Sequence, residues 1–384
     1  MKLHRLTTWL ETRWVNPAYS GWLMAGLALF FFGAATNTMA GWLYAISGLM
    51  VALLVLAALL PARTLRGISL ERLPVQPVTI GDNLRLELLV HNSSAQPKTL
   101  IQVVDLLPPP LPLIRTAIEQ IPGRGCYRWT ADLPTQQRGI YRWQQLHLRT
   151  AAPLGLFWRR RSQTWPTKAV VYPTVLNLSH CPLIDQIGQS ENQQLSSFYQ
   201  SQLASEGLTR TLRPYRWGDS TRMIHWRTSA RYGDLRVREL ETHQGGQELV
   251  IGLDSEITWQ LDWFEQAVVA AASLYFYAVR QQRPVSLWTA ASGLVKDEQA
   301  VLETLAAVQA AEHLNPEAAR VQERLQANDA SVILWLTQAP DRLAGLSDGS
   351  RWLLWPSTDS MPRSAPNSGI LIQPDQPLQG QLQS

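Results

Sequence analysis

Arginine residues are concentrated in one short stretch in the middle of the chain. Eight of them lie between Arg210 and Arg238, among acidic and aromatic residues. Guanidinium groups form two-pronged hydrogen bonds with carboxylates and phosphates, so this stretch could bind an anion, a partner protein or its own acidic neighbours. The candidate residues for binding a partner or an anion are Arg213, Tyr215, Asp219, Arg222, His225, Trp226, Arg227, Arg231, Arg238 and Glu239.

Three interpretations of this arginine-rich stretch stay open. In the first, its arginines pair with Asp219, Asp234, Glu239 and Glu241 and fasten the flanking domains together. In the second, they form a docking surface at the N-terminus of a helix, where backbone N–H groups favour an anion. In the third, His225 is a catalytic residue. A lone histidine beside a tryptophan is more commonly packed than reactive, which disfavours the third interpretation.

Local signals place these residues on a helix followed by an extended segment. Gly218 is a turn residue, and Asp219 or Ser220 is suited to cap the N-terminus of a helix. Gly233 predicts the end of that helix. Leu235, Val237 and Leu240 then begin an extended segment.

The sequence contains no complete constellation for an enzyme. It lacks a Ser/His/Asp or Cys/His spacing, a pair of carboxylates suited to acid–base catalysis, and a glycine-rich phosphate loop. Nucleic-acid binding would need exposed aromatic residues interleaved with a basic face, and the net charge of +4 gives little support for it. We therefore predict a chain that is not an enzyme and has no nucleic-acid partner.

Two apolar runs near the N-terminus, at about 19–36 and 40–60, contain no charged residue. A transmembrane helix needs about 20 apolar residues to cross a hydrocarbon core of about 30 Å. The short turn between the runs predicts a helical hairpin within an N-terminal segment, 1–66. Neither run has a polar face, which argues against two buried core helices. The lipid bilayer is therefore an expected partner.

Basic residues flank this hairpin on its outer sides and are absent from its turn. By the positive-inside rule, both termini and the soluble domains should be cytoplasmic, which predicts an inner (cytoplasmic) membrane protein with two spans. A secretory signal peptide in the first run is an alternative, but it leaves the second run with the wrong flanking charges for an exported protein. The flanking residues are Lys2, Arg5, Arg13, Arg63, Arg66 and Arg72.

Two soluble domains are expected after the hairpin. Residues 67–175 consist of short alternating runs broken by Pro and Gly, which predicts an antiparallel β-sandwich. Residues 176–247 combine a Gln- and Ser-rich linker with the arginine-rich stretch. In residues 248–384, short apolar runs alternate with helical spacing, as at 261–280, which predicts an α/β domain with a mainly parallel sheet.

The arginine-rich stretch closely resembles the signature of the bacterial family known as domain of unknown function 58. The family pattern is Arg-x-Tyr-x-x-Gly-Asp-x-x-Arg-x-Ile-x-Trp-x-x-Ser-Ala-Arg, then Gly, then Val-Arg-Glu. The residues that meet it are Arg213, Tyr215, Gly218, Asp219, Arg222, Ile224, Trp226, Ser229, Ala230, Arg231, Gly233, Val237, Arg238 and Glu239.

This resemblance implies a fold and a partner. Family members carry a domain similar to the von Willebrand factor type A fold after the signature, and they are commonly encoded beside MoxR-type AAA+ ATPases. An adaptor that acts with such an ATPase in assembly or maturation at the membrane is the expected role. The family as a whole has no settled activity.

The resemblance also implies a degenerate metal site. The A-type fold often binds Mg²⁺ through an Asp-x-Ser-x-Ser loop after its first strand, with a Thr and an Asp from later loops, because hard oxygen ligands suit that ion. Here the loop reads Asp-Ser-Glu-Ile-Thr from Asp254 to Thr258, so Glu256 replaces a serine. Thr337 follows a later strand, and Gln338 stands where an aspartate is expected. No cofactor is certain, and Mg²⁺ is the one that these residues suggest.

Two functions from different classes follow. The first is a membrane-anchored, non-enzymatic interaction protein that uses the strand-end loops of the α/β domain and the arginine-rich stretch. The second is a metal-dependent hydrolase, or a regulator of one, that uses Asp254, Glu256 and Thr258.

Overall fold

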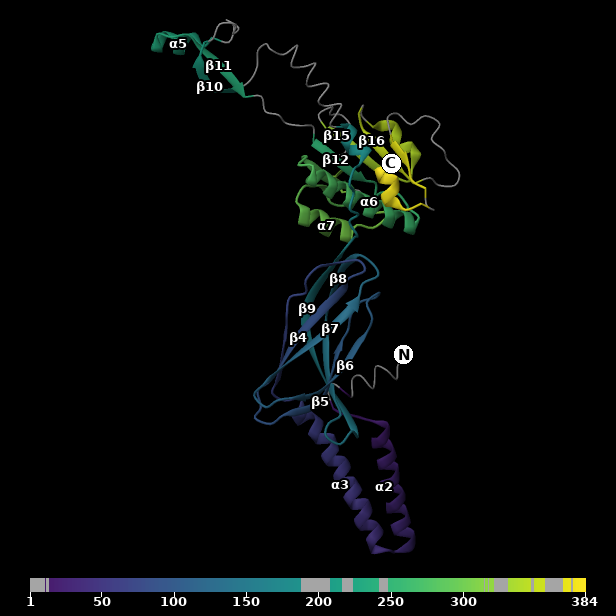
Figure 1. Cartoon of the computed structure of the whole chain (residues 1–384). Coiled ribbons are helices and arrows are strands. Elements are labelled where there is room, and N and C mark those ends of the chain that lie inside the picture. Colours follow the sequence, from purple (N-terminus) through teal and green to yellow (C-terminus); the bar gives the residue numbers. More distant parts are fainter. Residues whose placement is uncertain are drawn as a thin grey trace. The chain divides into compact units, whose positions relative to one another are not determined.

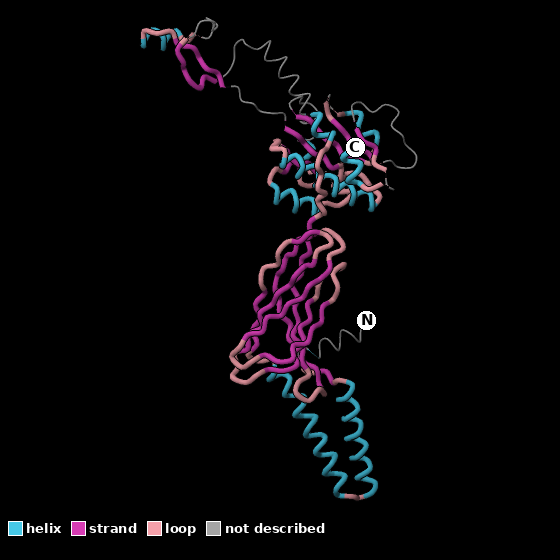
Figure 2. The backbone as a smooth tube through the Cα atoms, viewed as in Figure 1, coloured by secondary structure: helices cyan, strands magenta, loops and turns pink. Residues whose placement is uncertain are grey.

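Two compact units divide the chain, Met1–Tyr172 and Pro173–Ser384. Figures 1 and 2 show the elements of both units in a computed structural model, and each unit has a hydrophobic core of its own. The structure describes residues 11, 14–187, 208–215, 224–241, 248–313, 315–316, 318–320, 331–346, 349–355, 369–373 and 376–384.

Two long helices, α2 (Tyr19–Thr38) and α3 (Gly41–Thr64), form a hairpin in the first unit (Figure 1). Met39 adopts the left-handed conformation at the turn, and Ser47 Oγ donates a hydrogen bond of 2.9 Å from α3 to the Ala28 carbonyl of α2. By length and composition both helices could cross a membrane, and 17% of the most apolar window of each is buried. They coincide with the two predicted runs, and each extends a few residues further.

The strands of the first unit form two sheets. The larger sheet has the order β1-β9-β8-β5-β6, with β3 paired to β9, and the smaller sheet has the order β2-β4-β7. Neighbouring strands are antiparallel except β3 and β9, which are parallel. The strands are β1 (Asn16–Pro17), β2 (Ile68–Arg72), β3 (Val78–Thr79), β4 (Asn83–Asn92), β5 (Lys98–Asp105), β6 (Ile114–Ile121), β7 (Cys126–Pro134), β8 (Gly139–Thr150) and β9 (Phe157–Tyr172).

Alternation along these strands builds the core between the two sheets. Leu84, Leu86 and Leu88 of β4 are almost fully buried, whereas Arg85 between them is exposed, as the period of two requires. Side chains from both sheets belong to one hydrophobic cluster. The predicted antiparallel sandwich is therefore confirmed in outline, with one parallel pair at its edge.

One ion pair lies inside this core. Arg72 of β2 donates to Asp105 of β5 at 2.6 Å, and Trp143 Nε1 donates to the other oxygen of the same carboxylate at 3.1 Å. Since β2 and β5 belong to different sheets, the pair joins the two layers. A buried charge without its partner is strongly destabilising, so both residues are needed together.

The second unit contains a mixed sheet with the order β14-β13-β12-β15-β16-β17. Five strands are parallel, and only the edge strand β14 (Gly293–Val295) is antiparallel among the described residues. The parallel strands are β12 (Glu248–Leu253), β13 (Val285–Thr289), β15 (Ser331–Thr337), β16 (Arg351–Leu354) and β17 (Gly369–Leu371). Helices of this unit include α6 (Leu261–Arg280), α7 (Glu298–Ala307), the 3₁₀ helix η2 (Pro340–Gly345) and α9 (Leu378–Gln383).

A row of tryptophans packs on one face of this sheet. The ring of Trp335 on β15 lies over Gly252 on β12, and a Cβ at position 252 would overlap it. Trp288 of β13 packs against Trp335, with ring centroids 5.2 Å apart. Gly369 makes room for Trp352 in the same way. Glycine is therefore required at these strand positions because a neighbouring indole fills the space of its side chain.

Part of the predicted linker, 176–247, belongs to the core instead. Leu178, Cys181 and Ile184 are almost fully buried in the hydrophobic cluster of the second unit, and residues 182–187 are helical. Arg280 of α6 donates a hydrogen bond of 3.0 Å to the Leu178 carbonyl. The sparse apolar residues of this segment carry no regular period, which is why the sequence suggested a linker.

Candidate functional site

The arginine-rich stretch folds locally as a strand, a short helix and a second strand. Strand β10 (Leu208–Pro214) pairs antiparallel with β11 (Arg236–Glu241), and α5 (Trp226–Tyr232) precedes β11. An isolated bridge between Ile224 and Val237, both buried, ties the start of the helical segment to β11. We call residues 208–215 and 224–241 the signature hairpin. The predicted extended segment is β11, but β10 was not predicted.

His225 caps the helix of the signature hairpin. Its Nδ1 accepts a hydrogen bond of 3.2 Å from the Thr228 amide, and Gly233 ends the helix in the left-handed conformation, at φ 77°. Ser229 Oγ donates to the His225 carbonyl and accepts from the Arg236 amide, which joins α5 to β11. The expected cap, Asp219 or Ser220, lies outside the described residues, and the observed cap gives His225 a structural role.

The outer side of α5 carries aromatic and basic side chains. Trp226 is 65% exposed and Tyr232 is 60% exposed, and Arg227 and Arg231 are exposed as well. The guanidinium of Arg236 lies 4.6 Å from the centre of the Tyr232 ring, within the range of a cation–π contact. Tyr232 was missed in the sequence because it falls outside the family pattern. Exposed aromatic residues beside arginines are typical of binding surfaces.

For the other candidate residues of the arginine-rich stretch, the structure gives mainly the backbone pairing. Tyr215 is half-buried, and its amide donates to the Leu235 carbonyl at 2.8 Å. Arg213 pairs in register with Val237 in the β10–β11 ladder. Arg238 and Glu239 also belong to this ladder, whereas Asp219 and Arg222 lie outside the described residues. The pairing of these arginines with acidic neighbours therefore stays a prediction.

A second group of predicted residues meets at the carboxyl ends of two parallel strands. Asp254 follows β12, and Thr337 ends the adjacent strand β15. Thr337 Oγ1 donates to Asp254 Oδ2 at 2.8 Å and accepts from the Ala339 amide at 3.0 Å. We call Asp254, Ser255, Glu256, Thr337 and Arg342 the strand-end cluster. Ligands in open α/β sheets bind at this edge, where the strand order reverses.

Asp254 is buried in an incompletely satisfied environment. It is 1% exposed, and its Oδ1 has no hydrogen-bond partner among the described residues. Burial raises the pKa of this carboxyl above its ordinary value, opposed by the hydrogen bond from Thr337 and by the positive charge of Arg342. A buried polar atom without a partner is rare in folded proteins and costs free energy.

The cluster does not fit the expected Mg²⁺ site. Glu256 accepts a hydrogen bond of 2.8 Å from Arg342, which already neutralises its charge, and Thr258 is exposed at the surface. Thr337 already donates to one oxygen of Asp254, and no group of three or more His, Cys, Asp or Glu side chains suited to a metal occurs among the described residues. Mg²⁺ prefers several oxygen ligands and bound waters around an open position. Arg342, 86 residues from Glu256, could not be found from the sequence pattern.

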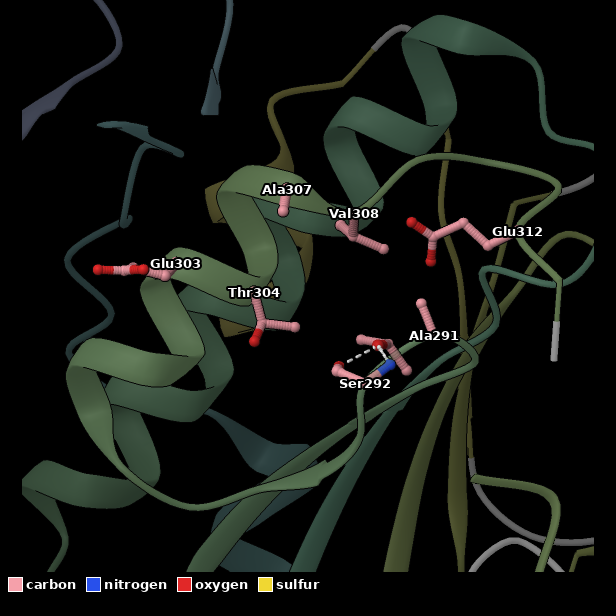
Figure 3. Close-up of a pocket in the computed structure, with 8 residues that line it drawn as sticks. Ala291, Ser292, Glu303, Thr304, Ala307, Val308 and Glu312 are labelled. Carbon is pink, nitrogen blue, oxygen red and sulfur yellow. Dashed lines mark hydrogen bonds between the residues drawn. The ribbon is translucent and has the colours of Figure 1, made fainter. Parts of the chain in front are cut away.

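A pocket of about 230 Å³ lies beside this cluster, between the end of β13 and helix α7 (Figure 3). Thr289 and Ser292 share a hydrogen bond of 2.6 Å on its wall, and Glu312 also lines it. The Glu312 amide donates to the Ser255 carbonyl at 2.9 Å, which connects the pocket to the strand-end cluster. The rest of its lining is mixed: Ala291, Ala307 and Val308 are small or apolar, whereas Glu303 and Thr304 of α7 are polar.

Comparison with known proteins supports the resemblance for one part of the chain. Residues 211–329 match the family described as "Protein of unknown function DUF58". The match includes most of the signature hairpin and the first strands of the α/β sheet. No curated protein matches the chain.

Two solved structures are similar to this chain only at low scores. A β-glucosidase from Listeria innocua in complex with gluconolactone is 12% identical over 28% of this chain, with a TM-score of 0.18. The matched part spans 16% of that enzyme. A GH20 exo β-N-acetylglucosaminidase from Vibrio harveyi is 9% identical, with 76% of this chain and 78% of that chain covered and a TM-score of 0.15. Scores this low carry no argument about fold or function.

Proposed function

We propose that this chain is a membrane-anchored, non-enzymatic interaction protein that docks a partner through its signature hairpin. The observation that carries the proposal is the outward display of Trp226, Tyr232 and two arginines on a helix that is fixed by its own caps and by β11. A preformed surface lowers the ordering cost of binding, and aromatic residues with arginine dominate the energetics of protein interfaces.

The proposed partner is a MoxR-type AAA+ ATPase. The resemblance to the DUF58 family supports this choice, because members of that family are commonly encoded beside such ATPases. The basic side chains of α5 suit an acidic patch on the partner, since complementary charges speed association and fix orientation. The chain would then act as an adaptor in assembly or maturation at the membrane.

The apolar hairpin would hold this adaptor at the inner face of the cytoplasmic membrane. Helices α2 and α3 have the length and composition of spans, and basic residues flank them on the outer sides alone. The positive-inside rule then assigns both termini and both soluble units to the cytoplasm. A cytoplasmic ATPase could reach the signature hairpin in that topology.

The α/β unit would supply a second, metal-independent contact surface. Its strand order, with one antiparallel edge strand, supports an arrangement like the von Willebrand factor type A fold. The ion pair between Glu256 and Arg342 supports a contact surface that works without a metal ion. The guanidinium of Arg342 already provides the positive charge that a metal ion would bring to Glu256. No described donor set favours the alternative of a metal-dependent hydrolase.

A capture experiment tests the docking proposal. The full-length protein in detergent would be immobilised and offered a purified MoxR-type ATPase from the same organism. The Trp226→Ala/Arg231→Ala variant should lose most of the capture, while Leu261→Ala, an exposed apolar residue on α6, should retain it. Equal capture by the folded hairpin variant would reject the signature hairpin as the docking site.

A further inference from the structure

The loop 151–156 of the β-sandwich is fastened to the start of helix α2, within the same unit. Figure 2 shows both apolar helices joined to one end of the sandwich. The Ala18 amide donates to the Leu156 carbonyl at 2.8 Å, and Ser20 Oγ donates to the Gly155 carbonyl at 3.0 Å. The loop is therefore held at the level at which α2 begins.

The start of strand β5 lies at the same end of the sandwich, beside the other helix. Lys98 Nζ donates to the carbonyl of Arg63, in the last turn of α3, at 3.1 Å. Thr150 Oγ1 donates to the Leu100 carbonyl at 2.9 Å, which joins β5 to the strand that leads into the loop. We call the loop 151–156 and the first residues of β5 the helix end of the sandwich.

Two leucine side chains are exposed at the helix end. Leu154 is 42% exposed, and Leu100 is 58% exposed. Leu100 also has a positive φ of 53°, in the left-handed region that a leucine rarely adopts. Backbone outliers of this kind are more frequent at functional positions than elsewhere, so the displayed side chain of Leu100 calls for a role.

Exposure alone does not distinguish these two leucines. Leu113, just before β6, is 51% exposed as well. It lies at the opposite end of the sandwich, because Ile114 pairs with Asp105 at the far end of β5. Single exposed leucines are common on soluble proteins. What distinguishes Leu100 and Leu154 is their place beside the ends of two long apolar helices.

The depth of Leu154 follows from the proposal that α2 and α3 span a membrane. The polar layer on each side of the hydrocarbon core is about 5–7 Å thick. Leu154 directly precedes Gly155, which is bonded to the first turn of α2, and consecutive Cα atoms are about 3.8 Å apart. Tyr19 and Trp22, exposed in the same turn, are aromatic residues of the kind that concentrate in this layer. The spans would therefore place Leu154 within the interfacial layer.

Three turns close the sandwich at the helix end, and they contain no Asp or Glu. These turns are 93–97, 122–125 and 151–156. Ser93 Oγ donates to the Gly67 carbonyl, just after α3, at 2.9 Å, and the Arg124 amide donates to the Ser94 carbonyl at 2.8 Å. At the opposite end, Asp82 is exposed in the turn before β4. Turns without carboxylates suit a surface of anionic headgroups, which repels negative charge.

We propose that Leu100 and Leu154 insert into the interfacial layer of a phospholipid bilayer, so that the sandwich itself contacts the membrane. Insertion removes apolar surface from water, which is favourable. Together with the hydrogen bonds to α2 and α3, the contact fixes the orientation of the sandwich on the membrane. This inference rests on the proposed membrane anchoring.

The test measures the depth of each leucine position in the full-length protein, reconstituted in phospholipid nanodiscs. Leu100→Cys and Leu154→Cys would each be labelled with a nitrobenzoxadiazole dye. The background is Cys126→Ser, because Cys126 is exposed, whereas Cys181 is buried. Lipids with a nitroxide near the headgroup should remove most of the emission of both labels. Lipids with a nitroxide near the end of the acyl chain should remove less of it.

Two further positions provide the controls. Leu113→Cys carries the same label on an exposed leucine at the opposite end of the sandwich, and its emission should persist with either lipid. Val51→Cys, at an exposed position near the middle of α3, reports on the anchoring itself. Its label should be quenched more by the acyl-chain nitroxide than by the headgroup nitroxide.

Failure of the proposed contact is distinguishable from failure of the anchoring. If the label at Leu100→Cys or at Leu154→Cys is quenched no more than the label at Leu113→Cys, the contact is rejected. Strong quenching at Val51→Cys in the same experiment would leave the anchoring intact. If the label at Val51→Cys is not quenched by either lipid, the two spans are rejected, and with them the membrane contact of the sandwich.

Discussion

The signature hairpin exposes Trp226 and Arg231, whereas the strand-end cluster buries Asp254 and Thr337. Trp226 and Arg231 lie on the outside of α5, while Asp254 and Thr337 are almost inaccessible and bonded to each other. An exposed aromatic and basic surface is available to a partner without rearrangement. The buried hydrogen bond between Thr337 and Asp254 contributes to the stability of the sheet edge instead. The comparison assigns docking to the signature hairpin and a stabilising role to the buried pair of Asp254 and Thr337.

The largest effect on stability is expected at the sheet beneath the cluster. In Gly252→Ala, the new Cβ would overlap the Trp335 ring, which is confined by Trp288, so the free energy of unfolding should fall by about 3 kcal/mol. Urea unfolding of the full chain, followed by tryptophan fluorescence, measures this loss. Gly380→Ala in α9, where the Cβ meets open space, is the matched control and should be nearly neutral.

A smaller decrease in the free energy of unfolding is expected when Asp254 loses the hydrogen bond from Thr337. Thr337→Val keeps the shape of the side chain but removes the hydroxyl, which should cost about 2 kcal/mol because a buried acceptor is left unsatisfied. Thr337→Ser keeps the hydroxyl and should recover most of the stability. If Thr337→Val were as stable as wild type, the cluster would not have the structural role assigned to it.

Loss of the helix cap should have a local effect of about 1 kcal/mol. His225→Ala removes the acceptor for the Thr228 amide, so α5 should open more often while the sandwich and the α/β sheet remain protected. Hydrogen exchange resolved by residue measures this difference. His225→Asn retains a side-chain acceptor at the cap and should restore protection. If His225→Asn also binds the ATPase as wild type does, then His225 acts through the helix cap and not as a catalytic residue.

The smallest effect is a dependence of stability on pH. Because burial raises the folded-state pKa of Asp254, folding favours its protonated form. The contribution of this group to stability is therefore greatest below the ordinary carboxyl pKa of 3.8 and decreases as pH rises through the raised value. Asp254→Asn should remove this contribution, seen as the difference between the two proteins in urea unfolding across that pH range. A constant difference would contradict the raised pKa.

The regular elements of the fold were largely predictable from the sequence. Helix α6 has the predicted bounds, 261–280, because a long helical period leaves little ambiguity. Strand β6 was missed because polar residues occupy half of its positions without regular alternation, and β14 because three residues at a sheet edge carry no pattern. Strand β10 depends on pairing with β11, which local preference does not reveal.

The sites were predictable only in part. The meeting of Asp254 with Thr337 follows from adjacent parallel strands that end at the same edge. The pairing of Glu256 with Arg342 joins residues far apart in sequence, and the cap at His225 replaces the stronger local signal at Asp219. Such contacts depend on tertiary packing, so residue type and spacing alone do not specify them.

The dissociation constant between the full-length protein and a MoxR-type ATPase tests the central claim most directly. Trp226→Ala should weaken binding at least about 30-fold, as expected for an interface residue worth 2 kcal/mol or more. Thr337→Ser, which keeps the strand-end hydrogen bond, should leave the constant unchanged. An unchanged constant in folded Trp226→Ala would contradict the assignment of docking to the signature hairpin.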